Sequence, residues 1–275
     1  MTNKFYLQVL NNHKFKLIRE LSKEEYMKFN QASTFMSKLN TKLYFFRMVD
    51  YDFIELKNFE KEYNFQINID PLVDSEAIIF EFFKLLHNYL SSINLFLNQY
   101  SANIKRDYDK ELFDEFEELR RTLYDEHLSY KIIYELRNEV HHSQLPIVKF
   151  NAKRNDAGKL EAKIYIQKDF LKCTKLKNDE DFLKLDDLID IYEHMENMNS
   201  YLMILAKKIL KYELDIHIEY YEFLKELIDE INIDGKICVL KFNKFTPIGF
   251  KPNIIFLNRK LICLIDKIKE YKNEL

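Results

Sequence analysis

Residues that interrupt helices are scarce in this sequence. Of its 275 residues, only 3 are glycine and 4 are proline. Because glycine and proline are the residues that helix interiors tolerate least, their scarcity predicts long helices. Hydrophobic residues make up 47% of the chain. This share excludes a disordered polypeptide, and at this length it is enough to build a sizeable core.

Cysteine is rare, and tryptophan does not occur at all. The cysteines are Cys173, Cys238 and Cys263, an odd number with neither a CxxC motif nor a Cys/His spacing typical of a metal site. We interpret them as reduced thiols of a cytoplasmic protein. The glycine-rich phosphate loop, the GxSxG elbow and zinc-finger spacings are also missing from the sequence.

The sequence has no long uninterrupted apolar run. Its most apolar stretch, residues 78–97, contains Glu81, Lys84, His87 and Asn88, which would be costly in lipid. The first residues lack the apolar core of a signal peptide. We therefore expect a cytoplasmic protein without a membrane association.

Positive charge is not in excess either, since the net charge is −3 and the isoelectric point is near 6.2. Nucleic-acid binders are usually basic overall or along one stripe, so the total charge provides no attraction to RNA or DNA. A local groove with a few cations would still be enough for a transient encounter with RNA.

Apolar residues at helical spacing dominate the middle of the chain. They predict a mainly α fold, in which antiparallel helices form a bundle over residues 70–232. The expected helices are residues 75–100, 107–126, 129–142, 185–212 and 215–231.

Alternating patterns predict strands around this bundle. A β-hairpin with a turn near Gly158 is expected as an insert at about residues 147–167. Residues 1–69 are expected to form an N-terminal elaboration of a hairpin and short helices. Residues 233–275 are expected to form two short strands and a terminal helix that pack with the N-terminal part. Together the two termini would form a small mixed α/β elaboration.

Side chains with the potential for catalysis are concentrated at the end of residues 129–142. They are Arg137, Asn138, His141 and His142. Residues four apart share a helix face, which pairs Arg137 with His141 and Asn138 with His142. Arginine is a permanent planar cation, and histidine is an acid or base near neutral pH, so the cluster suits chemistry at a phosphate. The alternative is an ordinary solvated helix end, where both residue types are favourable.

These residues resemble the hallmark of the HEPN family, the higher eukaryotes and prokaryotes nucleotide-binding domains. The family motif is often RNxxxH, and the run from Arg137 to His142, RNEVHH, fits it with His142 as the last position. The helix geometry does not decide between His141 and His142, whereas the family pattern favours His142. The resemblance implies a HEPN-like helical bundle that places two copies of the motif across a homodimer interface.

The resemblance also implies an activity. Many HEPN proteins are metal-independent endoribonucleases of toxin–antitoxin and anti-phage systems. Carried over to this chain, it implies RNA as substrate, Arg137 and His142 as catalytic residues, Asn138 and His141 as supporting residues, and no cofactor. A cognate antitoxin or another defence-system partner would be possible. The alternative is a non-catalytic module that binds nucleotides, RNA or protein, or a scaffold partner in a two-gene system.

One metal site has to be weighed against this interpretation. Glu139 and His142 form Glu-x-x-His, the arrangement found in di-iron helical bundles. No second Glu-x-x-His occurs in the chain, so such a site would be incomplete within one subunit. We expect no metal. His87 is interpreted as a packed or interfacial residue. The remaining histidines, His13, His127, His194 and His217, are interpreted as surface or core residues.

Overall fold

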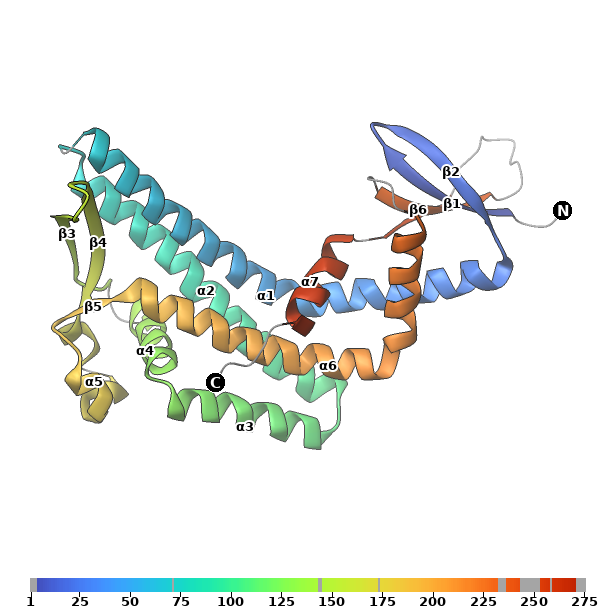
Figure 1. Cartoon of the computed structure of the whole chain (residues 1–275). Helices are drawn as coiled ribbons and strands as arrows, with labels where there is room; N and C mark the ends of the chain where they lie inside the picture. The colour runs from blue at the N-terminus through green and yellow to red at the C-terminus, as the bar shows by residue number, and fades with distance from the viewer. Residues whose placement is uncertain are drawn as a thin grey trace. The chain divides into compact units, whose positions relative to one another are not determined.

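The computed structural model is mainly helical, with two small antiparallel sheets (Figure 1). The structure describes residues 4–70, 72–142, 145–172, 174–231, 236–242, 253–257 and 259–270. The predicted mainly α fold is confirmed. No helix within these ranges is long and apolar enough to span a bilayer.

The chain forms two compact units. One comprises residues 44–205, and the other comprises residues 1–43 together with residues 206–275. Helices α1 (Lys23–Ile69) and α6 (Ile191–Ile231) each contribute residues to both units. The boundaries expected from the sequence, after residues 69 and 232, fall at or next to the ends of these two helices.

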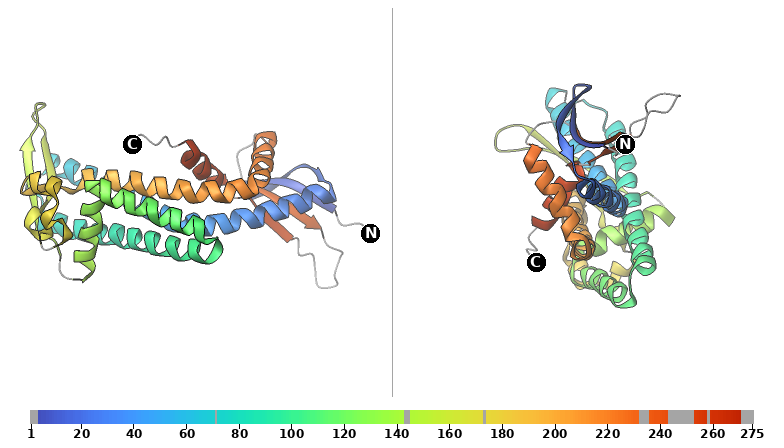
Figure 2. Two further views of the ribbon diagram at one scale, coloured as in Figure 1. Left: turned by 90° about the horizontal axis from the view of Figure 1, so that it is seen from below. Right: turned by 90° about the vertical axis from the view of Figure 1, so that its right-hand side faces the viewer.

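The unit of residues 44–205 contains helices α2 (Ser75–Asp107), α3 (Lys110–Glu126) and α4 (Leu128–His142), which pack against one another (Figure 2). Two aspartates define where α2 and α3 begin. Asp74 accepts hydrogen bonds from the backbone N–H groups of Glu76 and Ala77 in α2, and Asp109 accepts one from Leu112 in α3. Such caps satisfy N–H groups that lack a partner within the helix, so they fix the helix starts.

The same unit contains the predicted hairpin. Strands β3 (Val148–Arg154) and β4 (Leu160–Gln167) pair antiparallel, and the short strand β5 (Leu188–Asp190) adds to β4. Gly158 has a φ of +76°, a left-handed conformation that favours glycine in the turn. The alternation expected for β4 is confirmed, since Ala162, Ile164 and Ile166 are fully buried. The helix expected from residue 185 begins later, at Ile191, because strand β5 occupies the residues just before it. The short helix α5 (Glu180–Lys184) precedes β5.

Two asparagines of α1 extend this sheet. Strand β5 covers only the last three residues of β4, which leaves backbone groups of Leu160 and Ala162 without a strand partner on that side. Asn64 accepts from the N–H of Ala162 at 2.7 Å and donates to its carbonyl at 3.1 Å. Asn68 does the same for Leu160, at 2.8 and 2.7 Å. The amide side chains therefore act as strand partners, which buried backbone groups require.

The strands predicted at the two termini form one sheet in the order β2-β1-β6-β7. It consists of β1 (Lys4–Asn11), β2 (Lys14–Leu21), β6 (Lys236–Phe242) and β7 (Asn253–Phe256), all antiparallel. Helix α7 (Arg259–Glu270) follows β7. The expected turns at residues 234–235 and 246–252, and also Cys173, lie outside the described residues.

The short helices expected before residue 69 are a wrong prediction, because α1 is a single helix of 47 residues. Its sequence contains neither glycine nor proline, so nothing in it ends the helix early. Most of its buried residues recur at intervals of three, four or seven positions, which is the spacing of one helix face. They include Phe29, Ala32, Met36, Leu39, Leu43, Phe46, Val49, Leu56, Tyr63 and Ile67. Similarly, the expected break between residues 212 and 215 is a kink inside α6 at His217.

Candidate functional site

Helix α4 holds the predicted site residues next to a buried stripe. Ile132, Ile133 and Leu136 have no exposed surface, as the predicted apolar face requires, whereas Val140 is half-buried. The helix extends to His142, so all four predicted residues lie in its last two turns. The residues that anchor α4 in the core therefore also fix the orientation of the cluster.

Arg137 is the most unusual residue of this cluster, because its charged side chain is only 7% exposed. Its guanidinium lies over the ring of Tyr134, with Cζ 4.1 Å from the ring centroid. Nη2 donates a hydrogen bond to Oδ1 of Asn138 at 2.7 Å. Both contacts leave the positive charge of the guanidinium uncompensated, because the amide is neutral and the ring offers only its quadrupole.

Arg137 has no carboxylate partner in the part of the chain that the structure describes. Other arginines, by contrast, pair with carboxylates: Arg19, Arg106, Arg120 and Arg121. A charge removed from water is costly unless it is paired. A guanidinium also carries five N–H donors in a planar fork that matches phosphate oxygens. The surroundings of Arg137 therefore favour binding of an anion.

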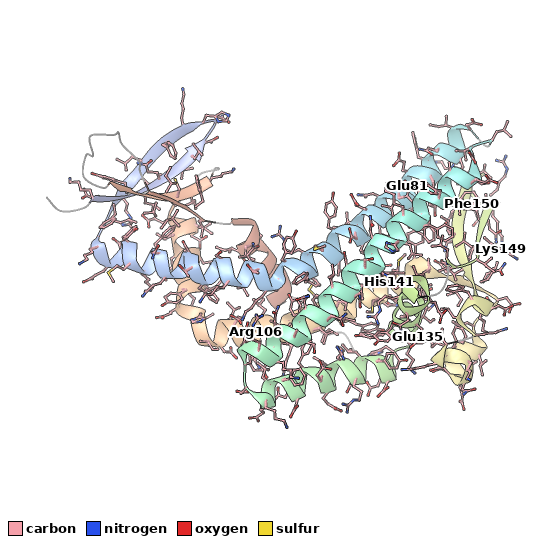
Figure 3. All side chains as sticks on the ribbon, turned by 180° about the vertical axis from the view of Figure 1, so that it is seen from behind. Glu81, Arg106, Glu135, His141, Lys149 and Phe150 are labelled. Carbon is pink, nitrogen blue, oxygen red and sulfur yellow. The ribbon has the colours of Figure 1, made fainter. Side chains whose placement is uncertain are left out.

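His141 lies beside a histidine of another helix. The ring centroids of His141 and His87 are 5.3 Å apart, with an angle of 65° between the ring planes. His141 is half-buried and His87, on α2, is exposed. Figure 3 shows His141 near the end of α4, next to α2. Two imidazoles at this distance can serve as an acid and a base near neutral pH.

The sequence interpretation did not place His87 at the site. One sequence feature could have pointed to His87: both His87 and His141 lie beside the apolar face of a long helical pattern. Periodicity shows which face of a helix is buried, but it does not give the register between two helices. The contact between α2 and α4 therefore became visible only in the structure.

His142 is the last residue of α4, and its backbone is helical. Its side chain lies outside the described part of the structure. Of the four predicted residues, the structure thus brings together Arg137 and Asn138 directly, and it adds His87 to His141. The choice between His141 and His142 as the base stays a prediction.

Two other polar contacts of α4 connect it to neighbouring helices. Glu135, only 4% exposed, accepts a hydrogen bond from the hydroxyl of Tyr124 on α3 at 2.9 Å. Burial raises the pKa of Tyr124, and so does the hydrogen bond to Glu135. Ser129 Oγ lies 2.9 Å from Nδ1 of His194, whose pKa is lowered by burial. These contacts fix the position of α4 against α3 and α6.

Within the described residues, no group of three or more His, Cys, Asp or Glu side chains is placed to hold a metal ion. Glu139 is half-buried. Its partner in the Glu-x-x-His pair is His142, whose side chain lies outside the described part of the structure. The cluster at the end of α4 thus offers one cation, an amide and imidazoles, which are groups for phosphate binding and proton transfer.

No family model, curated protein or solved structure matches this chain significantly. The resemblance to the HEPN family therefore rests on the motif from Arg137 to His142 and on its place at the end of a helix.

Proposed function

We propose that the chain is a metal-independent endoribonuclease of the HEPN type, with a HEPN-like helical bundle and a role in a toxin–antitoxin or anti-phage system. The observation that carries the proposal is the state of Arg137. It is a nearly buried guanidinium without a carboxylate partner among the described residues, within a motif that also contains histidines. A phosphodiester would supply the missing negative charge.

In the proposed reaction, His142 takes the proton of a ribose 2′-hydroxyl, and the 2′-oxygen attacks the adjacent phosphorus. The bond from phosphorus to the 5′-oxygen breaks, which leaves a 2′,3′-cyclic phosphate on one product. Arg137 stabilises the negative charge that develops on the phosphoryl oxygens, and Asn138 orients the guanidinium through its hydrogen bond. His141, beside His87, donates the proton that the leaving 5′-oxygen requires.

A homodimer is part of the proposal. One subunit carries a single RNxxxH motif, and two copies across an interface would create a cationic cleft despite the net charge of −3. DNA lacks the 2′-hydroxyl and would not be cleaved by this route.

Cleavage of a labelled single-stranded RNA in EDTA tests the proposal. Wild type is compared with Arg137→Ala and His142→Asn. The matched controls are Arg106→Ala, at an exposed arginine near the end of α2, and His13→Asn, in an exposed turn. We expect chelator-resistant cleavage to cyclic-phosphate ends. Both site variants should lose at least about 100-fold in rate, and the controls should retain it.

A substrate with a single 2′-deoxy nucleotide at the cleaved position provides a second test. It should resist cleavage at that position only, because the nucleophile is missing there. Cleavage that continues there, or that is unchanged in both site variants, would exclude the mechanism.

The second candidate function is a non-catalytic module that binds nucleotides, RNA or a partner protein. The low exposure of Arg137 favours it, since a guanidinium packed on Tyr134 is suited to hold a phosphate without turnover. Absence of cleavage, together with RNA binding that Arg137→Ala weakens, would establish this candidate in place of the nuclease.

A further inference from the structure

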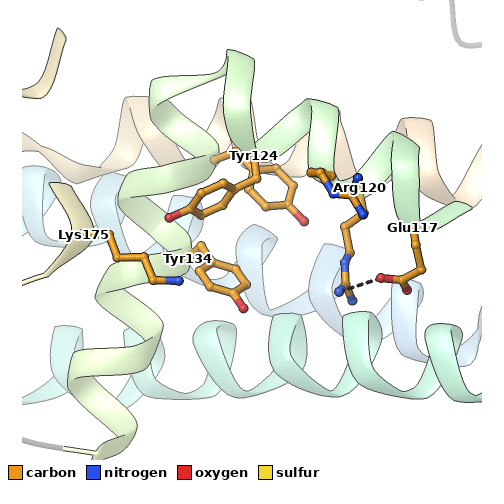
Figure 4. Close-up of a pocket in the computed structure, with 7 residues that line it drawn as sticks. Glu117, Arg120, Tyr124, Tyr134 and Lys175 are labelled. Atoms are coloured by element: carbon orange, nitrogen blue, oxygen red, sulfur yellow. Dashed lines mark ion pairs between the residues drawn. The ribbon is translucent and has the colours of Figure 1, made fainter. Parts of the chain in front are cut away.

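A pocket of about 250 Å³ opens between α3, α4 and the 3-10 turn η2 (Lys175–Asn178). Among the described side chains, its lining includes neither Arg137 nor a histidine. Figure 4 shows Tyr124 and Tyr134 between Lys175 on one side and Arg120 on the other. Its lining residues are Glu117, Arg120, Arg121, Tyr124, Tyr130, Tyr134 and Lys175.

The charges around the pocket are mostly positive. Three cationic residues line it against one carboxylate, that of Glu117. Arg120 pairs with Glu117 at 2.8 Å, and the largely exposed Arg121 pairs with Glu118 outside the lining at 2.8 Å. Lys175 is exposed and pairs with none of the described carboxylates. Arg120 and Arg121 are each paired with a carboxylate, so Lys175 supplies the positive charge at the pocket that no described carboxylate compensates.

Tyr130 adds a hydrogen-bond group that points to a ligand. The residue is only 1% exposed, and its hydroxyl has no hydrogen-bond partner within the described structure. A buried polar group without a partner is costly, so an occupant of the pocket that accepts a hydrogen bond would remove this cost. Burial raises the pKa of Tyr130, although Arg120 and Arg137 oppose the effect, so the hydroxyl stays protonated and can donate.

From these observations we infer that the pocket is a binding site for a terminal phosphate group, carried by a small phosphate monoester or by the 5′ end of a nucleic acid. Arg120 and Lys175 would bind its oxygens from opposite sides, and the Tyr130 hydroxyl would donate to one of them. The three terminal oxygens of a phosphate monoester can accept from Arg120, Lys175 and Tyr130 together, whereas a carboxylate has only two oxygens.

The size of the pocket limits the rest of the ligand. Pockets for drug-sized molecules are typically about 300–1,000 Å³, and this one is about 250 Å³. The phosphate and the sugar next to it therefore fit inside, with the tyrosine rings as walls, whereas a dinucleotide would extend into solvent. This inference goes beyond the proposed function, because it requires no cleavage and none of the motif residues.

Isothermal titration with defined probes tests the inference. AMP, adenosine, and two short DNA oligonucleotides that differ only in a 5′-phosphate or a 5′-hydroxyl are titrated into the full chain. DNA is used because the proposed reaction cannot cleave it. We expect saturable binding of AMP or of the 5′-phosphorylated oligonucleotide, and at least about tenfold weaker binding of the matched probe without phosphate. Binding of only one phosphorylated probe would identify the source of the phosphate.

Three variants locate the site. Lys175→Ala changes an exposed residue of the rim, Arg120→Ala removes the paired guanidinium, and Tyr130→Phe removes only the hydroxyl. Each should weaken phosphate binding by about five- to tenfold or more. Lys110→Ala is the control, since it removes a largely exposed lysine of the same helix α3.

Several results would overturn the inference. These are no binding of any phosphorylated probe at about 10 mM, equal binding of the probes with and without phosphate, or binding that Lys175→Ala leaves unchanged. Because Lys175 is exposed, its replacement is expected to leave the fold intact. The unfolding temperature of all three variants separates loss of binding from loss of folding.

Discussion

At the scale of single residues, the environment of Arg137 carries a cost to stability that the proposed function would explain. The guanidinium is 7% exposed and stacks on Tyr134, while its hydrogen bond goes to the neutral Asn138. Removing a cation from water without a counter-ion destabilises the folded state. Such a residue is retained where its charge has a use, and the use that the motif indicates is binding of a phosphate.

This balance leads to a prediction for Arg137→Met. Methionine keeps the length of the side chain and its contact with Tyr134, but it removes the buried charge. We expect the free energy of unfolding to rise by about 1 kcal/mol, while RNA cleavage or RNA binding is lost. Urea denaturation measures the first effect, and the activity assay measures the second.

Arg106→Met, at a largely exposed arginine, is the control and should change the free energy of unfolding little. A variant Arg137→Met that is less stable than wild type by more than about 1 kcal/mol would mean that the guanidinium contributes to folding. In that case its environment would be no evidence for an anion site.

At the scale of elements, the asparagines of α1 provide a test of how the helix is joined to the sheet. Asn64 and Asn68 each bind both backbone groups of a residue in β4, where β5 has ended. Replacing either by alanine leaves an N–H and a C=O of β4 without this partner. The expected loss is about 1–3 kcal/mol of unfolding free energy per variant.

Hydrogen exchange at the amides of Leu160 and Ala162 measures the effect locally. Exchange should accelerate at Ala162 in Asn64→Ala and at Leu160 in Asn68→Ala. Gln66→Ala, on the same helix but bonded only to Glu62 among the described contacts, should leave both amides protected. Protection that is unchanged in all three variants would show that the asparagines do not hold the strand.

The elements also show how far the sequence determines the fold. Helix α2 could be predicted almost to its first residue, because Asp74 caps it and its apolar face is broad. The continuity of α1 was missed, since short windows of its sequence do not show one face, and only the absence of glycine and proline over 47 residues indicated it. The short strand β5 was missed because its pairing with β4 is a long-range contact.

The same limit applies to the candidate site. Arg137, Asn138 and His141 could be placed on one helix from sequence, because helical spacing is local. The proximity of His87 to His141 and the pocket between α3, α4 and η2 depend on packing between helices. The periodicity of apolar residues does not show how two helices are aligned against each other, so neither feature could be predicted from the sequence alone.

At the scale of the whole molecule, the question is how an acidic chain would bind RNA. The net charge of −3 gives no long-range attraction. Under the proposed function, the attraction would come from local cations, namely Arg137 on α4 and the cations around the pocket. If two subunits bring their motifs together, the local positive charge doubles without any change in the charge per chain.

A mixing experiment tests this part of the proposed function. Arg137→Ala and His142→Asn are each expected to be inactive alone. If Arg137 of one subunit acts with His142 of the other, each mixed dimer carries one intact site and one site that lacks both groups. An equal mixture with free exchange of subunits contains about half mixed dimers. Activity should then return to about one quarter of the wild-type value.

Each variant alone, at the same total protein concentration as the mixture, is the control. Light scattering establishes the mass of the species in each sample. A monomeric wild type that cleaves RNA would contradict the shared site while leaving the roles of Arg137 and His142 intact. A dimer whose mixture stays inactive would mean that each site is complete within one subunit. In that case His141 and His87, which already lie beside each other in a single chain, would be the histidines to replace next.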